Sequence, residues 1–261
     1  MARELRRLLI SPGRLAAAGD PAVLGLEAAE THYLARVLRY RPGDRVAVIN
    51  GCGALWSASL EAGERLRLEQ PLDRPLQRAA FPLPQLRLAL AVPKREAELV
   101  WRMATELGAD RLLPLLAERR AVHGDLPLGR WLSIVTEAAE QCERLWLPDL
   151  EPPAEARQWL ARPPEGVGLV AVSRRPGLPP LGRYLADLVL PSAAAGQTLN
   201  LAIGPEGGWT SCEEGLALEA GWQPVSRGEG ILRTSTAAVA AVALLASWRE
   251  LSCASFPSPS P

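Results

Sequence analysis

From residue 86 onward, short apolar runs alternate with longer segments of helical periodicity, and this alternation constrains the fold more than any other feature of the chain. The runs that we expect to form strands are 86–92, 111–116, 167–172, 188–190, 199–203 and 223–226. The segments that we expect to form helices are 95–108, 130–148, 213–221 and 234–250. Continuous apolar strands separated by helices are typical of a parallel sheet covered on both faces. The pattern therefore predicts an α/β domain.

The helical segments carry apolar faces and end signals. The helix over 95–108 should bury Leu99, Val100, Met103 and Leu107 and end at Gly108. The helix over 130–148 should bury Trp131, Ile134, Val135, Ala138, Cys142 and Leu145 and end at Pro148. Thr210 and Glu213 form a capping box that fixes the start of the next helix. The helix over 234–250 is apolar almost all round, which predicts burial in the core or against a second subunit.

The first seventy residues have a different pattern, with four short strands at 6–10, 45–50, 54–61 and 64–70. Pro42-Gly43-Asp44 and Asn50-Gly51 supply turns between them. A helix over 27–39 lies between the strands in sequence, which favours a small β-barrel closed around one helix. The proline-rich stretch 71–84 indicates a linker. We therefore expect domains at 1–74 and 75–253, followed by a disordered tail at 254–261.

The charge balance of the chain is zero, but residues 1–45 carry eight arginines and five acids, a net of +3. A basic end on a neutral chain indicates a polyanionic partner, although a solvated basic surface has the same composition. The four cysteines are scattered and have no neighbouring histidines, which argues against structural zinc and disulfides. No apolar run is long enough to cross a bilayer. We expect a cytoplasmic protein with no metal and no membrane contact.

Ligands of open α/β sheets bind beyond the carboxyl ends of the strands. Three loops there are rich in glycine or proline: VSRRPGLP after the strand at 167–172, GPEGG from Gly204, and SRGEGILRTST from Ser226. Glycines let the backbone approach a flat ligand closely. Each loop alone is equally consistent with an ordinary turn, but two glycine-rich loops at adjacent junctions favour a ligand site.

Other common sites do not match the sequence. There is no Gly-x-x-x-x-Gly-Lys-Ser/Thr phosphate loop, and the partial Gly-x-Gly strings lack the context of a dinucleotide site. The two histidines, His32 and His123, have no Gly-x-Ser-x-Gly elbow near them, which argues against a serine hydrolase. We expect His123 to be a surface loop residue.

The segments IGPEGGWTSCEE and VSRGEGILRTSTAAVA together resemble the paired signature of the SPOUT-class ribosomal RNA (uracil-N3) methyltransferases. ATELGADRLLPLLAERR, EAAEQCERLWLP and THYLARVLRYRPGDRV extend the resemblance over nearly the whole chain in order. The resemblance implies a PUA-like N-terminal barrel that binds RNA and a C-terminal α/β domain with a trefoil knot. It also implies a homodimer that uses S-adenosylmethionine to methylate N3 of a uridine in the small-subunit (16S) ribosomal RNA of the 30S subunit.

On this basis we expect the cofactor to be held by Ser173, Ile203, Gly204, Pro205, Gly207, Gly208, Gly228, Ile231, Leu232, Arg233 and Thr236. Uracil N3 must lose a proton before it becomes nucleophilic, so positioning and proton removal should dominate the rate. Glu206 is the first candidate for orienting or deprotonating the base, and Arg233 or Arg144 for stabilising charge on its oxygens. A carboxylate that caps backbone N–H groups is the alternative for Glu206. Arg7, Arg36 and Arg39 are candidates for phosphate contacts or for ordinary surface charges.

The chain departs from the family pattern at two positions near this site. Gly230 stands where the family has a basic residue, and Ser235 where it has a carboxylate. Two further readings therefore remain open. One is an RNA-binding protein that keeps the fold without catalysis, and the other is a methyltransferase of the same class that acts on a different RNA position.

Overall fold

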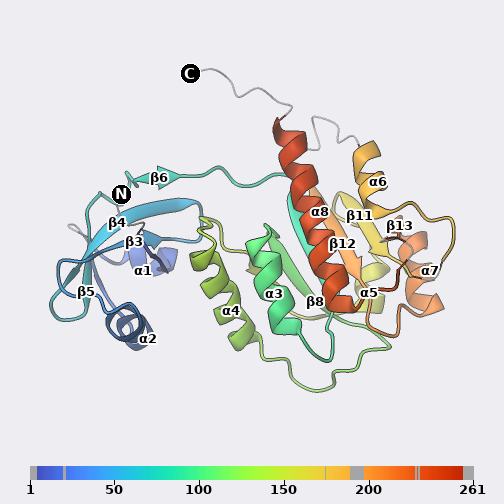
Figure 1. The fold of residues 1–261 in the computed structure, drawn as a ribbon, viewed down its shortest axis with the longest axis horizontal. Coiled ribbons are helices and arrows are strands. Elements are labelled where there is room, and N and C mark those ends of the chain that lie inside the picture. The colour runs from blue at the N-terminus through green and yellow to red at the C-terminus, as the bar shows by residue number, and fades with distance from the viewer. Residues whose placement is uncertain are drawn as a thin grey trace. The chain divides into compact units, whose positions relative to one another are not determined.

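The computed structural model describes residues 5–19, 22–173, 175–188, 197–226, 228 and 230–254. The chain divides into two compact units: residues 1–81 with 136–147, and residues 82–135 with 148–261 (Figure 1). The end of the strand expected at 188–190 lies outside the described residues, and so does the tail expected at 254–261 apart from Ala254, which is the last residue of the C-terminal helix. The predicted boundary at residue 74 stays a prediction, and the first compact unit continues to Phe81.

The first unit contains a mixed sheet whose described strands run in the order β1-β3-β4-β5-β2, with β6 paired to β4. The strands are β1 (Arg7–Leu9), β2 (Val23–Gly25), β3 (Arg45–Ile49), β4 (Ala54–Glu61), β5 (Arg65–Leu68) and β6 (Gln77–Arg78). The helices are α1 (Pro12–Ala16) and α2 (Ala28–His32), which continues into a π-helical turn (Tyr33–Val37). Ile10, Leu34, Val48 and Trp56 are among the side chains that form the core between them. The four strands expected here are confirmed, whereas β2 is too short to show a pattern.

The predicted turn between β3 and β4 is confirmed. Gly51 has a φ of 69°, which a residue with a side chain rarely adopts. The Asn50 side chain accepts hydrogen bonds from the amides of Cys52 at 2.8 Å and Ala54 at 3.0 Å. In this turn Asn50 therefore supplies the hydrogen-bond acceptor, and Gly51 supplies the backbone conformation.

Residues 136–147, which follow the second unit's first stretch in sequence, belong to the first unit. They comprise the second half of α4 (Leu128–Gln141) and the segment after it. The Trp146 ring packs edge-on against Phe81 with the centroids 4.7 Å apart. Its indole N–H donates to the carbonyl of Ala80 at 3.0 Å. The amide of Leu9 in β1 donates to the Glu140 carboxylate at 2.7 Å.

The second unit contains a sheet in which all described strand pairs are parallel. Its order is β10-β8-β7-β12-β11-β13, with β9 also paired to β8. The strands are β7 (Gln85–Ala91), β8 (Arg111–Leu116), β9 (Asp149–Leu150), β10 (Ala154–Glu155), β11 (Val167–Ala171), β12 (Thr198–Ile203) and β13 (Gln223–Val225). Every residue of β12 is buried, as expected for a strand covered on both faces. The α/β prediction for this part of the chain is confirmed.

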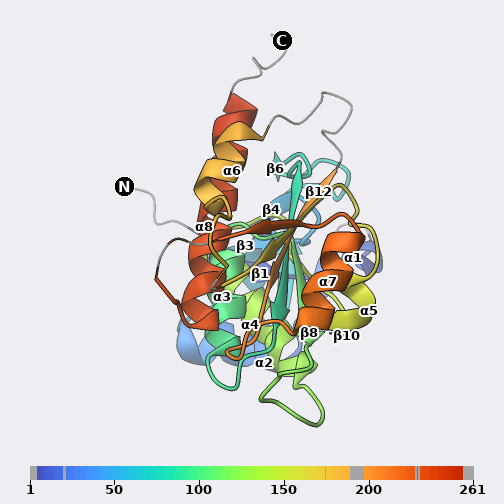
Figure 2. The same ribbon diagram turned by 90° about the vertical axis from the view of Figure 1, so that its right-hand side faces the viewer.

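Helices cover both faces of this sheet (Figure 2). The helices α3 (Ala97–Glu106), α6 (Leu181–Asp187) and α8 (Thr234–Ala254) pack together on one face, and α5 (Ala156–Leu160) and α7 (Ser211–Glu219) on the other. Trp222 packs against Trp159 of α5, with the ring centroids 4.6 Å apart. The short helices α5 and α6 were missed because neither is long enough to establish a helical period.

Two details of the predicted helices are wrong. Leu99 is 39% exposed, because the buried face of α3 is turned toward Val100, Trp101 and Ala104. The helix α4 ends at Gln141 rather than near Pro148, and Glu143 then adopts a φ of 64°. A left-handed residue after a helix reverses the chain direction, which is a common way for helices to stop.

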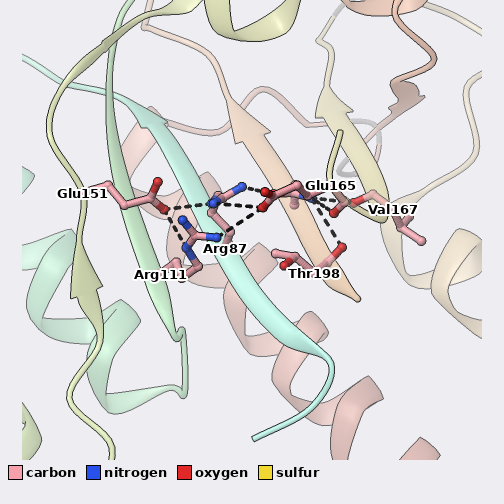
Figure 3. Close-up of polar contacts among 7 residues, drawn as sticks. Arg87, Arg111, Glu151, Glu165, Val167 and Thr198 are labelled. Carbon is pink, nitrogen blue, oxygen red and sulfur yellow. Dashed lines mark hydrogen bonds and ion pairs between the residues drawn. The ribbon is translucent and has the colours of Figure 1, made fainter. Parts of the chain in front are cut away.

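A buried arginine joins four segments near the amino ends of the parallel strands (Figure 3). The Arg87 guanidinium in β7 contacts the Glu151 carboxylate at 2.8 Å and the Glu165 carboxylate at 3.5 Å. Its Nη1 donates to Oδ1 of Asn200 in β12 at 2.8 Å. The Asn200 amide donates in turn to the carbonyls of Glu165 at 2.7 Å and Val167 at 3.2 Å. Arg111 of β8 pairs with the same two carboxylates.

Replacing Asn200 by leucine should lower the free energy of unfolding by about 2–4 kcal/mol, because a buried charged donor and the facing carbonyls lose their partner. Urea denaturation measures this loss. The control is Glu106→Gln, which breaks the exposed pair with Arg102 at 3.7 Å. Exposed pairs contribute little, so we expect a change of about 0.5 kcal/mol or less there. Equal effects of the two substitutions would contradict a structural role for the buried network.

Burial raises the pKa of Glu140 to about 7, the nearby carboxylates of Glu137 and Glu30 add to the rise, and the Leu9 amide opposes it. A carboxyl group whose folded pKa exceeds its unfolded pKa stabilises the fold at low pH. That contribution disappears as the pH rises through the folded pKa. Wild-type protein should therefore lose about 1–3 kcal/mol relative to Glu140→Gln between pH 4.5 and pH 8. Guanidinium denaturation of both proteins across this pH range tests the prediction. Unfolding free energies that change in parallel with pH in the two proteins would refute it. The glutamine oxygen can still accept from Leu9.

Candidate functional site

The described strands of the second unit end at one edge of the sheet because they are parallel. The loops that follow them there are 92–96 after β7, 117–127 after β8, 172–180 after β11, 204–210 after β12 and 226–233 after β13. This is the edge at which ligands of open α/β sheets bind. It is opposite the Arg87 network.

A cavity of about 500 Å³ lies between the loops that follow β11 and β13. It is lined by Val172, Ser173, Arg175, Pro176, Gly177, Leu178, Pro180, Ser226, Gly228, Gly230 and Ile231. The volume is within the range of small-molecule sites. The lining combines apolar side chains and exposed backbone with one charged group, Arg175, whose Nη1 is 2.6 Å from the Glu214 carboxylate.

Backbone hydrogen bonds hold the two loops of the cavity together. Ser226 pairs with Pro180 in a parallel bridge. The Ser226 amide donates to the carbonyl of Pro179 at 2.9 Å, and its carbonyl accepts from Leu181 at 2.8 Å. The bridge holds the residues just before α6 against the residue that follows β13, so the two cavity loops are fixed to each other at this point.

Glycine is required at two kinds of place around this edge. Gly228 has a φ of 106°, and a Cβ there would meet nothing within 4 Å, so the space beside it is open. A Cβ on Gly204 would lie 3.1 Å from the Trp209 ring. That ring is held by its indole N–H, which donates to the carbonyl of Ala171 at 3.1 Å. Gly228 thus leaves room in the cavity, whereas Gly204 admits a tryptophan behind the loop.

Arg119, in the loop after β8, and Glu213, in the first turn of α7, connect the Gly-Pro-Glu-Gly-Gly loop to its surroundings. Arg119 Nη1 donates to the carbonyl of Gly207 at 3.0 Å. Glu213 is fully buried and forms the predicted capping box with Thr210, which confirms the start of α7. Its other oxygen accepts from the amide of Glu118 at 2.9 Å. Sequence reasoning found the capping box but not Arg119, because the contact joins residues 88 positions apart.

The candidate catalytic residues lie in different settings. Glu206 is exposed, and its carboxylate accepts from the amide of Lys94 at 3.2 Å. Arg233 is exposed directly before α8. Arg144 follows α4 and belongs to the first unit. The contact with Lys94 gives Glu206 a structural task in joining two loops, and its part in chemistry stays a prediction.

The cavity brings together three of the predicted cofactor residues, namely Ser173, Gly228 and Ile231. The other predicted residues are absent from its described lining: Ile203, Gly204, Pro205, Gly207, Gly208, Leu232, Arg233 and Thr236. They lie at the end of β12, on the adjoining loop after it, on the approach to α8 or in its first turn. The prediction missed Arg175 through Leu178, although the signal was present in the proline- and glycine-rich string after β11.

The three arginines predicted to contact RNA differ in availability. The Arg7 side chain is 12% exposed and pairs with the Glu143 carboxylate at 3.0 Å. Arg36 and Arg39 are exposed, and Arg39 has a φ of 58° at the end of the π-helical turn. Arg36 and Arg39 therefore present charge to solvent, whereas the guanidinium of Arg7 is engaged within the first unit. The exposed position predicted for His123 is confirmed.

Among the described residues, no three histidine, cysteine or acidic side chains gather in a way that could hold a metal ion. No helix in the same residues has both the length and the apolar character needed to cross a membrane.

The family model for an RNA methyltransferase domain matches residues 80–246, and the model for an RNA methyltransferase PUA domain matches residues 26–69. The chain therefore belongs to the RNA methyltransferase family. It is 41% identical over 241 residues to ribosomal RNA small subunit methyltransferase E of Synechocystis sp., an alignment that covers 91% of this chain and 76% of the relative. The enzyme of the same name from Mycobacterium bovis is 32% identical over 85% of each chain.

Two solved structures are similar over nearly the whole chain. Ribosomal RNA small subunit methyltransferase E of Neisseria gonorrhoeae, bound to S-adenosyl methionine, has a TM-score of 0.76 at 27% identity. The protein Lpg2936 of Legionella pneumophila, in complex with the cofactor SAM, has a TM-score of 0.78 at 27% identity. Each alignment covers 94% of this chain and 98% of the solved one.

Replacing Gly204 by alanine should displace Trp209 and lower the free energy of unfolding by about 1–3 kcal/mol, as overpacking of a close contact does. The matched control is Gly215→Ala within α7, where an added Cβ would meet nothing within 4 Å. Alanine is the better helix former, so the control should gain about 0.5–1 kcal/mol. Chemical denaturation measures both. A Gly204→Ala protein as stable as wild type would show that the loop yields without cost.

Proposed function

We propose that this chain transfers a methyl group from S-adenosylmethionine to N3 of a uridine in small-subunit ribosomal RNA. The observation that carries the proposal is the backbone-lined cavity at the carboxyl edge of the sheet, in a chain of the RNA methyltransferase family. The relatives named as ribosomal RNA small subunit methyltransferases support the choice of substrate. A substrate of this kind also implies a cytoplasmic location.

The cavity residues fit the proposed cofactor. The open space beside Gly228 and Gly230 gives a flat group access to the backbone. Leu178 and Ile231 offer apolar surface to a ring, and Arg175 offers a positive charge to a carboxylate. When bound, S-adenosylmethionine supplies an electrophilic methyl group. Ser173, Arg175, Gly228 and Ile231 are the residues that we propose hold it.

The protein must hold the uracil in line with this group and accept its N3 proton. We retain Glu206 as the candidate proton acceptor, because one carboxylate oxygen bound to the Lys94 amide fixes the side chain and leaves the other oxygen available. The exposed guanidinium of Arg233 is the candidate for stabilising negative charge that develops on the uracil oxygens. Arg144 is kept as a second candidate.

We propose that the first unit is a PUA-like barrel that binds the RNA backbone through Arg36 and Arg39. The match to an RNA methyltransferase PUA domain and the exposure of both side chains support this. Phosphate contacts release counterions, so replacing both arginines should weaken RNA binding and flatten its salt dependence. An unchanged slope of log K against log salt would exclude both residues from the interface.

Two further features are proposed from the resemblance. The first is a homodimer, which the exposed apolar residues Leu244 and Leu251 on α8 support, at 45% and 71% exposure. Sedimentation velocity should then show a dimer that Leu244→Glu dissociates.

The second is a trefoil knot, for which the placement of β12 between β7 and β11 gives a compatible strand order. A crystallographic trace of the chain through 181–234 tests the knot directly.

The function is tested with purified protein, radiolabelled cofactor and 30S subunits that lack the modification. We expect label in the small-subunit RNA and, after nuclease digestion, in a single 3-methyluridine. Cofactor binding is measured in parallel by calorimetry. A folded protein that binds cofactor without labelling RNA would favour a binding protein that lacks catalysis. Label in another nucleoside would identify a methyltransferase with a different target.

A further inference from the structure

Three side-chain hydrogen bonds connect the loop after β7, the loop after β12 and the start of α8, one bond between each two of them. Glu206 accepts from the amide of Lys94 at 3.2 Å, which connects the loops after β12 and β7. The Thr234 hydroxyl donates to the carbonyl of Gly204 at 3.2 Å, which connects the start of α8 to the loop after β12. The Ser235 hydroxyl donates to the Glu96 carboxylate at 2.5 Å, which connects α8 to the loop after β7. Each of these three segments is therefore hydrogen-bonded to the other two.

Glu96 is the unusual member of this triangle. It has a φ of 69° and a ψ of 10° at the start of α3, a left-handed conformation that costs a residue with a side chain about 1–2 kcal/mol. Strain of this kind persists only where the surrounding structure over-determines it. The short hydrogen bond to Ser235, which is 8% exposed, is the contact that holds the side chain in place. An ionised acceptor makes such a bond stronger than a neutral one.

The position of the carboxylate also suits the helix that it contacts. Ser235 is in the first turn of α8, where the unpaired N–H groups and the helix dipole favour a negative charge. Gly230 and Ile231 of the cavity wall lie five and four residues before Ser235. Whatever fixes the start of α8 therefore also limits where this wall can move.

We propose that Glu96 is a positioning residue for the cofactor site: its carboxylate anchors the first turn of α8 and thereby holds 230–235 against the loops after β7 and β12. This rests on the proposed function only in naming the ligand. The requirement is for one carboxylate between the start of α3 and the start of α8. Either helix can carry it, and here it comes from the α3 side.

The first test uses the protein without cofactor, so it does not depend on methyl transfer. In Glu96→Gln and in Ser235→Ala, hydrogen exchange of the Ala237 amide, which bonds the Arg233 carbonyl at 2.9 Å in the first turn of α8, should rise about ten- to hundredfold, as expected when a charged hydrogen bond that anchors this turn is lost. The double variant should exchange no faster than either single variant, because both remove the same bond. Unchanged protection, or additive increases, would overturn the proposal.

The second test moves the carboxylate across the contact. Calorimetry should show cofactor binding weakened about tenfold or more in Glu96→Ser, where the carboxylate is missing. It should also weaken in Ser235→Glu, where two carboxylates meet. Glu96→Ser with Ser235→Glu exchanges the two groups and should return the dissociation constant to within about threefold of wild type. A double variant that binds as poorly as Glu96→Ser would overturn the proposal, because a merely structural loss is not repaired by the exchange.

The matched control is Glu98→Gln, which removes a carboxylate from the first turn of the same helix. Glu98 pairs with Arg130 at 2.5 Å on the surface and has no described contact with α8. Exchange of the Ala237 amide and cofactor affinity should stay at wild-type values. Wild-type protein that binds cofactor without methylating RNA would refute the proposed reaction and leave both tests of Glu96 intact.

Discussion

The second unit depends on a single buried guanidinium. Arg87 lies inside a parallel sheet, and its charge is tolerable there only because the Glu151 carboxylate and the Asn200 amide oxygen occupy its donors. These partners come from strands and loops far apart in sequence, so the network is complete only when the whole strand order is formed. The network therefore links the register of β7 to that of β12 at the amino end of the sheet.

With the amino end fixed in this way, the carboxyl end can carry loops that serve a ligand. The two strands that Arg87 joins, β7 and β12, end in loops at the same edge of the sheet as the loops that line the cavity. Side-chain hydrogen bonds from Glu96, Thr234, Glu206 and Arg119 join the loops of this edge to one another. Polar contacts suit this edge because the glycines there have no side chains with which to pack. A rigid scaffold with polar-fastened loops is how binding sites on parallel sheets are generally built.

Features that depend on a local pattern of residues could be predicted from the sequence, whereas contacts between residues far apart in the chain could not. Strands such as β12 and the capping box of Thr210 and Glu213 are local patterns, and both were predicted. The bridge between Pro180 and Ser226 joins loops that are far apart in the chain, so the cavity was only partly foreseen, through Ser173, Gly228 and Ile231. The replacement of an expected carboxylate by Ser235 looked like a loss until the structure placed Glu96 beside it. Spatial neighbours of this kind leave no mark in a single sequence.

The division of α4 has a consequence for how the protein is made. Its second half and the residues to 147 complete the first unit, supplying Trp146 beside Phe81 and Glu140 beneath Leu9. A nascent chain emerges from its amino end and folds in units as they become available. Part of the surface of the N-terminal sheet therefore stays uncovered until residues 136–147 have been synthesised. The first unit is therefore completed only after residues 82–135 of the second unit have been synthesised.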